Sequence, residues 1–229
     1  MAQWDELKTT ELFSLAESLS GEFLKRFTYP WEALPSIAEM IRAIGNTLPE
    51  DRYEKRGEDI WVARSAKVFE SAYLSGPLIV GENAEVRHCA FIRGSVLIGD
   101  GATVGNSSEL KNSILFNKAQ VPHYNYVGDS ILGTYAHMGA GSITSNLKSD
   151  HTNVTVRVNG ERIETGLRKF GAMLGDHVEV GCGTVMNPGT VIGKNSMIYP
   201  VSCVRGFVPA NSIFKKEDEI VTKIVTKDK

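Results

Sequence analysis

One stretch of this sequence, residues 108–146, is unusually polar and carries residue types that do acid–base chemistry. His123 lies within it, next to Tyr124 and three residues before Tyr126. An imidazole with a pKa of roughly 6.5 accepts a proton readily at neutral pH, so this histidine is a candidate general base. A lone histidine is more often an ordinary surface residue, and the assignment therefore depends on the elements that position it.

Apolar residues recur at intervals of six on both sides of this stretch. The first series is Val62, Val68, Leu74, Val80, Val86, Ile92, Ile98, Val104 and Leu110. After a slip of one residue the series continues through Leu115, Val121, Val127, Leu132 and Met138, and it returns as Leu174, Val180, Met186, Ile192, Ile198 and Val204. A helix repeats near 3.6 residues and a strand near 2, so a sustained period of six indicates a solenoid. Glycine follows many of these residues, and we expect it to relieve the turns.

The period predicts an all-β solenoid, namely a left-handed parallel β-helix of the hexapeptide-repeat class. A β-sandwich, the alternative, has no fixed period between strands. The coils should occupy residues 57–206, in the two blocks 57–146 and 169–206. Between them, residues 147–168 break the period around Asn159-Gly160, which predicts a β-hairpin arm.

The flanks of the solenoid are expected to differ from it. Residues 1–56 carry apolar residues at helical spacing and predict an N-terminal α-helical cap that covers the end of the solenoid, although this segment is also suited to binding a partner. Residues 207–229 are expected to form a charged C-terminal tail, with a short helix from Lys215 onward.

Composition narrows the classes of function. A net charge of −2 argues against nucleic-acid binding. Cys89, Cys182 and Cys203 are odd in number and lack CxxC spacing, so we expect buried thiols rather than disulfides or a thiolate zinc site. The first residues lack the features of a signal peptide, and no apolar run reaches the roughly 18 residues that span a membrane. The sequence therefore predicts a cytoplasmic protein with no membrane segment.

Four motifs carry a specific family resemblance. The segments are VPHYNYVGD (121–129), GAGSITSN (139–146), ELKN (109–112) and the Lys169-Phe170 pair ahead of Gly175-Asp176. They resemble the acetyltransferase domain of the bifunctional enzyme family that makes UDP-N-acetylglucosamine from glucosamine 1-phosphate. The resemblance covers residues 90–206. It implies an acetyl-CoA-dependent N-acetyltransferase that acts on an amino sugar 1-phosphate and works as a homotrimer.

The resemblance also implies the role of each matching residue. His123 takes the place of the family's general base. The positions that match its substrate site are Arg93, Glu109, Lys111, Tyr126, Asn146 and Lys169. His137 falls where the family has an asparagine, and it is either a sugar contact or a polar surface substitution. The positions expected to contact acetyl-CoA are Gly139, Ala140, Cys182 and Pro200, of which the last two replace a serine and an alanine.

These roles are chemically consistent. Arg93, Lys111 and Lys169 are suited to a sugar phosphate dianion, because cations make charge-assisted hydrogen bonds to phosphate oxygens. The imidazole of His123 would take the proton from the amine as it attacks the thioester. Backbone N–H groups near Gly139 and Ala140 would stabilise the oxyanion, and no metal is expected.

Four alternatives to this prediction were considered. Nothing in residues 1–56 resembles a nucleotide-binding loop, so uridyltransferase activity is not expected from this chain. Glucosamine 1-phosphate is the favoured acceptor and galactosamine 1-phosphate the other candidate. A non-catalytic sugar-phosphate-binding protein, or a trimerising partner of a nucleotidyltransferase, has the same motifs and would be separated by a turnover assay. A γ-type carbonic anhydrase needs two histidines five residues apart, and this chain has none.

Overall fold

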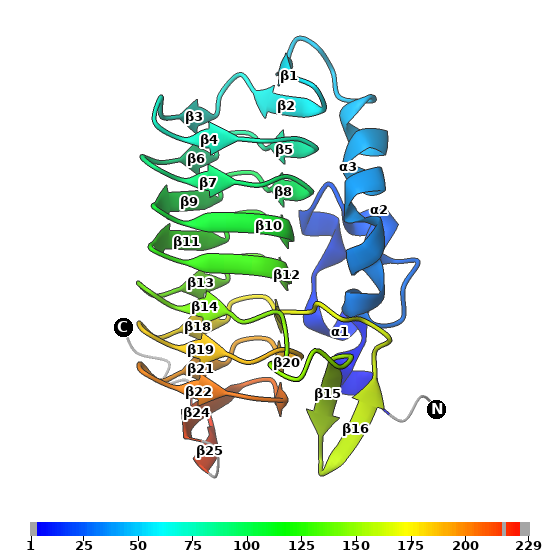
Figure 1. Ribbon diagram of the computed structural model, residues 1–229, viewed down its shortest axis with the longest axis vertical. Coiled ribbons are helices and arrows are strands. Elements are labelled where there is room, and N and C mark those ends of the chain that lie inside the picture. Colours follow the sequence, from blue (N-terminus) through cyan, green and yellow to red (C-terminus); the bar gives the residue numbers. More distant parts are fainter. Residues whose placement is uncertain (1–3, 217–218, 225–229) are drawn as a thin grey trace.

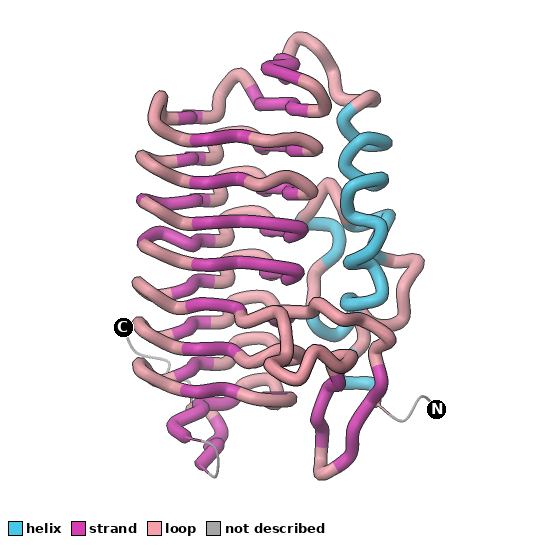
Figure 2. The backbone as a smooth tube through the Cα atoms, viewed as in Figure 1, coloured by secondary structure: helices cyan, strands magenta, loops and turns pink. Residues whose placement is uncertain are grey.

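Short parallel strands stack coil upon coil into a prism with three flat faces (Figure 1). The computed structural model describes residues 4–216 and 219–224. Strands of successive coils pair in register with one another, which confirms the predicted parallel β-helix. Figure 2 shows that the helices lie along one side of this stack.

Each face is a ladder of strands from successive coils. The front face consists of β4 (Tyr73–Leu74), β7 (Phe91–Ile92), the first halves of β10 (Glu109–Leu115) and β12 (Tyr126–Leu132), β14 (Ile143–Thr144), β19 (Val185–Met186) and β22 (Cys203–Val204). The back face consists of β3 (Lys67–Val68), β6 (Glu85–Val86), β9 (Thr103–Asn106), β11 (Gln120–His123), β13 (His137–Met138), β18 (Glu179–Val180), β21 (Met197–Ile198) and β24 (Ser212–Lys216).

The third face, which we call the covered face, differs from the other two in its outward side chains. It consists of β2 (Ile60–Ala63), β5 (Leu78–Val80), β8 (Val96–Ile98), the second halves of β10 and β12, β17 (Ala172–Leu174), β20 (Thr190–Ile192) and β23 (Phe207–Val208). The outward residues of these strands form one apolar row: Trp61, Ile79, Leu97, Ile114, Ile131, Met173 and Val191. A second protein layer must bury such a row.

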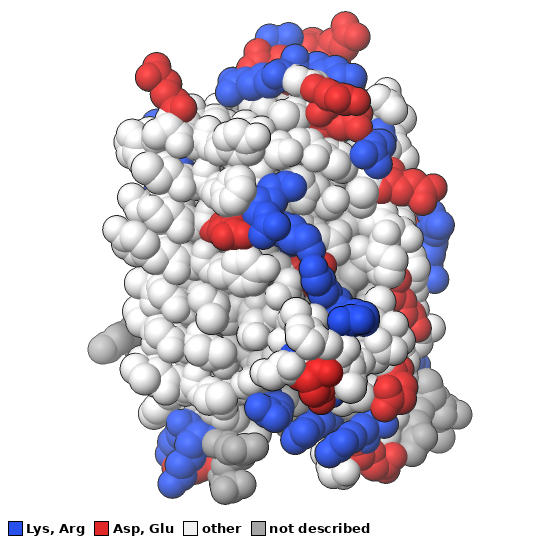
Figure 3. All heavy atoms as spheres, viewed as in Figure 1, with Lys and Arg blue, Asp and Glu red and all other residues white. Residues whose placement is uncertain are grey.

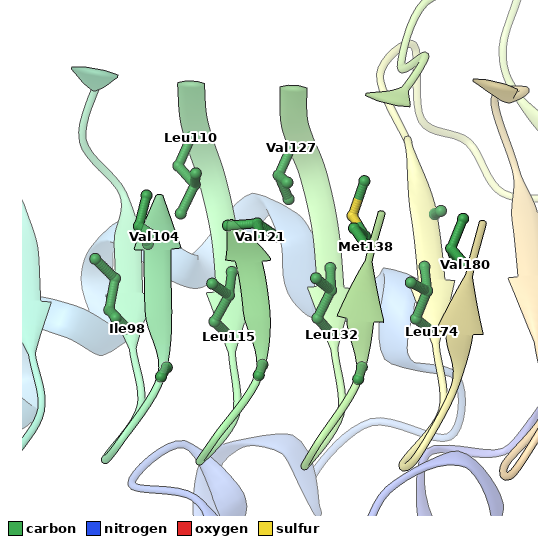
Figure 4. Close-up of a cluster of buried hydrophobic side chains, with 14 of the residues drawn as sticks. Ile98, Val104, Leu110, Leu115, Val121, Val127, Leu132, Met138, Leu174 and Val180 are labelled. Carbon is green, nitrogen blue, oxygen red and sulfur yellow. The ribbon is translucent and has the colours of Figure 1, made fainter. Parts of the chain in front are cut away.

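The residues at intervals of six fill the inside of the prism, as predicted. Most are fully buried, among them Val80, Ile98 and Leu115, and they stack on their equivalents in the next coil (Figure 4). Glycines that follow them, such as Gly105, were expected to relieve the turns, but they do not have positive φ. A Cβ on Gly105 would instead lie 1.6 Å from the carbonyl oxygen of Pro122 in the next coil. These glycines therefore allow close approach of neighbouring coils.

Residues 4–48 lie along the covered face, so the predicted placement of this segment at the end of the solenoid is wrong. They form η1 (Asp5–Leu7), α1 (Thr9–Leu12), η2 (Leu15–Glu17), α2 (Gly21–Leu24), η3 (Pro30–Ser36) and α3 (Ile37–Gly45). Ile37 and Ile41 of α3 are fully buried and pack in one cluster with Leu97 and Ile114. The apolar row of the covered face is the physical reason for this placement, because it is far larger than the end of one coil.

Antiparallel strands protect the ends of the stack. β1 (Tyr53–Gly57) pairs with β2 at one end, and β25 (Glu219–Thr222) pairs with β24 at the other. The coils continue through β24, beyond the predicted boundary at residue 206, and residues 219–222 are a strand where a short helix was expected. Residues 217–218 and 225–229 of the predicted tail lie outside the described residues. A paired strand edge is shielded from pairing with another chain.

The break between the two blocks of coils is a hairpin, as its Asn159-Gly160 turn predicted. β15 (Thr155–Val158) and β16 (Glu161–Glu164) pair antiparallel, and both turn residues have positive φ, 48° and 82°. The hairpin does not stand free of the prism: Val154, Val156 and Val158 are buried on the covered face beside β20 and β23. It completes the layer that the helices begin.

The three cysteines are exposed, in contrast to the buried thiols that we expected. Cys203 lies on the outward side of the front-face ladder, opposite Val185, where side chains point away from the interior. Among the described residues, no helix is long and apolar enough to cross a membrane.

The packing of α3 on the covered face gives a stability prediction. Ile41→Ala should lower the free energy of unfolding by about 2–4 kcal/mol, because the fully buried side chain leaves a cavity between helix and sheet. Glu39→Ala, on the exposed side of the same helix, should change it by less than about 0.5 kcal/mol. Urea unfolding measures both. Equal effects would mean that the helix contributes little to the fold.

Candidate active site

Five of the predicted substrate residues gather where the front face meets the covered face. Arg93 and Lys111 each lie two residues beyond the outward residue of a front strand, in adjacent coils. Nη1 of Arg93 lies 2.7 Å from Oε1 of Glu109, which is the outward residue of β10. This hydrogen bond is the main cause that raises the pKa of the Arg93 guanidinium. The ladder also sets Glu109 directly opposite Tyr126 in the next coil.

A buried carboxylate, Asp129, holds this cluster together. Its oxygens lie 3.4 Å from Nζ of Lys111 and accept a hydrogen bond of 2.9 Å from Nδ2 of Asn112. The amide of Asn146 in the following coil donates to the same carboxylate. Asp129 is only 4% exposed and has φ of 49°, a conformation that aspartate tolerates better than most residues. One side chain thus fixes the positions of Lys111 and Asn146.

Tyr126 completes the cluster from the front-face side. Its hydroxyl accepts a hydrogen bond of 3.2 Å from Nδ2 of Asn146. Burial, followed by the nearby carboxylates of Asp129 and Glu109, raises the pKa of Tyr126, so its phenol is a hydrogen-bond donor at neutral pH. Gly128 faces both side chains: a Cβ there would lie 2.5 Å from the Tyr126 hydroxyl and 2.8 Å from the Asn146 amide. The absence of a side chain at Gly128 therefore makes room for them.

Lys169 is held at the base of the arm rather than by its hairpin. Its backbone forms an antiparallel bridge with Leu147, next to Asn146. The following residue, Phe170, is fully buried and stacks on Trp31 of η3 with ring centroids 5.7 Å apart. Phe170 also donates its N–H to the carbonyl of Asn146. The helical layer thus sets the course of the chain at Lys169, whose own side chain is exposed.

His123 lies at the opposite edge of the front face, where the back face turns into it. The buried side chain of Asn125 fixes this turn: it accepts from the N–H of His123 at 3.0 Å and donates to the carbonyl of Gly139 at 2.8 Å. The imidazole itself is exposed. A column of exposed residues continues from His123 along this edge, one residue for each successive coil: Ala140, Cys182 and Pro200.

The column contains His123, which is the predicted general base, and three of the residues expected to contact acetyl-CoA. Backbone bonds connect its steps, from Gly141 N–H to the His123 carbonyl and from Gly183 N–H to the Ala140 carbonyl. Successive coils are about 4.8 Å apart, so the column extends roughly 14 Å. Gly139, in contrast, donates its N–H to the carbonyl of Val180 at 2.7 Å. Its N–H is therefore engaged, which contradicts the predicted role of this group in an oxyanion hole.

His137 lies apart from the cluster, on the back face. It occupies the outward ladder between Gln120 and Glu179, and its Nδ1 lies 2.9 Å from Oε2 of Glu179. Within one chain the prism body separates it from Arg93 and Lys111. In the single chain, the position of His137 thus agrees with the second of its two predicted alternatives, a polar surface substitution.

Sequence reasoning missed Asp129, Asn112 and Asn125. Each lies inside a motif that drew attention for another residue: Asp129 closes VPHYNYVGD, and Asn125 is central to it. For Asp129 the available signal was an acidic residue directly after a glycine, Gly128. Asn112 and Asn125 have no glycine beside them and gave no such signal. A sequence shows the corner but not which donors converge there.

The comparisons with known proteins agree with this architecture. Residues 74–187 match the family described as the GMPPB C-terminal domain. The bifunctional protein GlmU of Methanococcus vannielii is 36% identical over 109 residues, which are 48% of this chain and 26% of that protein. The bifunctional sugar-1-phosphate nucleotidylyltransferase/acetyltransferase of Sulfurisphaera tokodaii is 40% identical over 97 residues, 42% of this chain and 24% of that protein.

The chain thus consists of a hexapeptide-repeat β-helix with a helical layer on one face. It is related in particular to the bifunctional nucleotidylyltransferase/acetyltransferases, as the four motifs predicted. It spans about a quarter of the length of these relatives. Among solved structures, the acetyltransferase domain of PglB from Neisseria gonorrhoeae matches 71% of this chain and 57% of its own length at 15% identity, with a TM-score of 0.39.

The convergence of donors on Asp129 gives a second prediction. Asp129→Ala should lower the free energy of unfolding by about 2–3 kcal/mol, because the partly buried amides of Asn112 and Asn146 and the charge of Lys111 lose their acceptor. Asp129→Asn should cost less, since its carbonyl still accepts. Asp150→Ala removes an exposed carboxylate that also pairs with a lysine and should have little effect. Urea unfolding in which the three variants behaved alike would contradict the central role of Asp129.

Proposed function

We propose that this protein is an acetyl-CoA-dependent N-acetyltransferase that acts on an amino sugar 1-phosphate, with glucosamine 1-phosphate as the favoured acceptor. The observation that carries the proposal is the arrangement of the front face. One edge of this face carries His123 and the column, which is suited to an extended thioester cofactor. The other edge carries the polar cluster with the cations Arg93 and Lys111. The motifs shared with the bifunctional relatives support it.

The proposed reaction uses His123 as the base. The amine nitrogen attacks the thioester carbonyl carbon of acetyl-CoA, and the imidazole takes the proton that this nitrogen loses. The C–S bond then breaks, the amide forms, and the CoA sulfur leaves and receives the proton. The exposed imidazole suits this role because both substrates must reach it. We propose the column from Ala140 to Pro200 as the binding edge for the cofactor, since an extended chain can follow its one residue per coil.

We propose that Arg93 and Lys111, with Lys169, bind the phosphate of the acceptor. Each of the first two already faces a carboxylate, Glu109 and Asp129 respectively. Lys111 stays close to its buried partner, whereas the Arg93 pair is exposed and screened by solvent. A phosphate would therefore compete with Glu109 for Arg93. The carboxylate keeps the guanidinium in place until the phosphate arrives.

A homotrimer is part of the proposal, and the helical layer constrains how it forms. The covered face is occupied within each chain, so the subunits must contact through the front and back faces. Exposed aromatic residues lie there: Tyr73 is 62% exposed and Phe91 42% on the front face, and Tyr124 is 65% exposed at the edge near His123. A neighbouring subunit would bury them and lie beside the column.

The base role of His123 gives a kinetic prediction. His123→Gln should lower kcat about 10²–10⁴-fold and leave the acceptor KM nearly unchanged, because the phosphate cluster is intact. Lys111→Gln should show the opposite split, with a rise in acceptor KM of about tenfold or more. His177→Gln, an exposed histidine stacked on Tyr135, is the control. Release of free CoA with glucosamine 1-phosphate measures all three.

Two results would count against this mechanism. Full turnover by His123→Gln would remove the residue from the reaction. Binding of glucosamine 1-phosphate by the unmodified protein without any CoA release would instead support the non-catalytic alternative.

The proposed assembly gives a prediction of mass. Light scattering should return three times the 25.1 kDa chain at micromolar concentration. Phe91→Glu should shift the distribution towards monomer, because a charge would be buried at the interface. Lys25→Glu on the exposed helical layer should leave the mass unchanged. A monomeric unmodified protein would refute the trimer.

A further inference from the structure

A groove of about 550 Å³ lies between the hairpin arm and the coils, below the polar cluster. Its floor includes Ser145, Asn187 and Arg205, which follow the front strands of three successive coils. Its outer wall is the side of the hairpin that carries Arg157 and Arg162. Figure 3 shows Lys and Arg side chains gathered at the level of the hairpin, separate from the basic run that crosses the middle of this view.

The two arginines of the hairpin stand directly opposite each other. Arg157 and Arg162 are cross-strand partners in the register of β15 and β16. Like charges in this position destabilise an antiparallel pair. In residues 4–216 and 219–224, neither arginine has a carboxylate within ion-pair distance. The packing of the arm does not account for them either, because the buried side of β15 is made by Val156 and Val158.

The groove has an excess of positive charge. Four cations line it, Lys148, Arg157, Arg162 and Arg205, against two carboxylates, Asp150 and Glu164. Lys148 lies 3.4 Å from Asp150, so that pair is locally neutral. Arg205 donates to the neutral side-chain oxygen of Asn187 at 3.2 Å. Three guanidinium groups from two separate elements therefore face one space without a matching number of anions.

We propose that this groove binds the diphosphate group of a nucleotide-containing ligand. Guanidinium groups bind phosphate oxygens in bidentate fashion, and three of them exceed what one monophosphate requires. The groove begins two coils beyond Lys111 of the proposed acceptor phosphate site: Lys111, Gly128 and Ser145 occupy the same place in successive coils, roughly 10 Å in all, and Asn187 lies one coil further. The inference goes beyond the proposed acetyl transfer and does not depend on it.

Two kinds of ligand contain such a diphosphate. One is a nucleoside diphosphate, as found in a sugar nucleotide, and the other is the 3′-phosphorylated ADP end of CoA. Within one chain the groove and the column beginning at His123 lie at opposite edges of the front face. A cofactor lying along the column of the same chain would therefore not reach the groove. The arms of the experiment separate the two sources.

The test is calorimetric titration of the full chain with inorganic pyrophosphate at low ionic strength. The Kd for pyrophosphate should rise at least about tenfold in the double variant Arg157→Gln/Arg162→Gln. It should rise about threefold or more in Arg205→Gln, a variant that changes a residue of the coils and leaves the arm intact. Arg26→Gln, an exposed arginine on the helical layer, should bind like the unmodified protein. Because the like-charge pair is removed, the double variant should melt at the same temperature or higher.

UDP and CoA are titrated in parallel. A weaker affinity of the double variant for UDP alone identifies a sugar nucleotide as the source, and a weaker affinity for CoA alone identifies the cofactor. Lys111→Gln should leave pyrophosphate binding unchanged, which keeps this test separate from that of the acceptor site. The proposal is overturned if the unmodified protein shows no saturable pyrophosphate binding, or if Arg26→Gln weakens it as much as the double variant.

Discussion

The apolar row on the covered face is the constraint on which the rest of the molecule depends. A β-helix needs large residues inside its coils, but here each coil from β2 to β20 also presents one outward, and Ile79, Leu97 and Ile131 are fully buried. Water cannot cover a continuous row of this length without a large free-energy cost. Two segments outside the coils are therefore required on that face: residues 4–48, which precede the coils, and the arm, which lies between their two blocks.

This layer reaches the candidate active site through two contacts. The carbonyl of Leu34 in η3 accepts a hydrogen bond from Asn112, whose amide also holds Asp129. The ring of Trp31 stacks on Phe170 and so fixes the chain beside Lys169. A helical segment with no proposed contact to substrate thus sets the geometry of the phosphate side of the site. Stability and positioning are coupled here, because the same residues serve both.

The sequence predicted the parts of the structure that follow from its period. Val86, Val104 and Val121 are interior because every coil must fill the same space, and the hairpin follows from Asn159-Gly160 alone. The position of the helical layer was predicted wrongly because the apolar row of the covered face is hard to recognise in the sequence. Its residues recur only once per coil, about every 18 residues, and each stands next to an interior residue that is also apolar. The site was predicted through its motifs, yet Asp129 was missed, since its importance lies in three donors that come from the coils before and after its own.

Charge pairing distinguishes the two regions that carry cations. At the polar cluster Arg93 and Lys111 each have a carboxylate partner, so an arriving phosphate gains only the difference between two pairings, and recognition depends on geometry. In the arm groove Arg157 and Arg162 have no such partner within the described part of the chain, and they oppose each other across the hairpin. There an anion gains the full interaction and also relieves a repulsion. The cluster is thus suited to selecting a particular substrate, and the groove to attracting a more highly charged one.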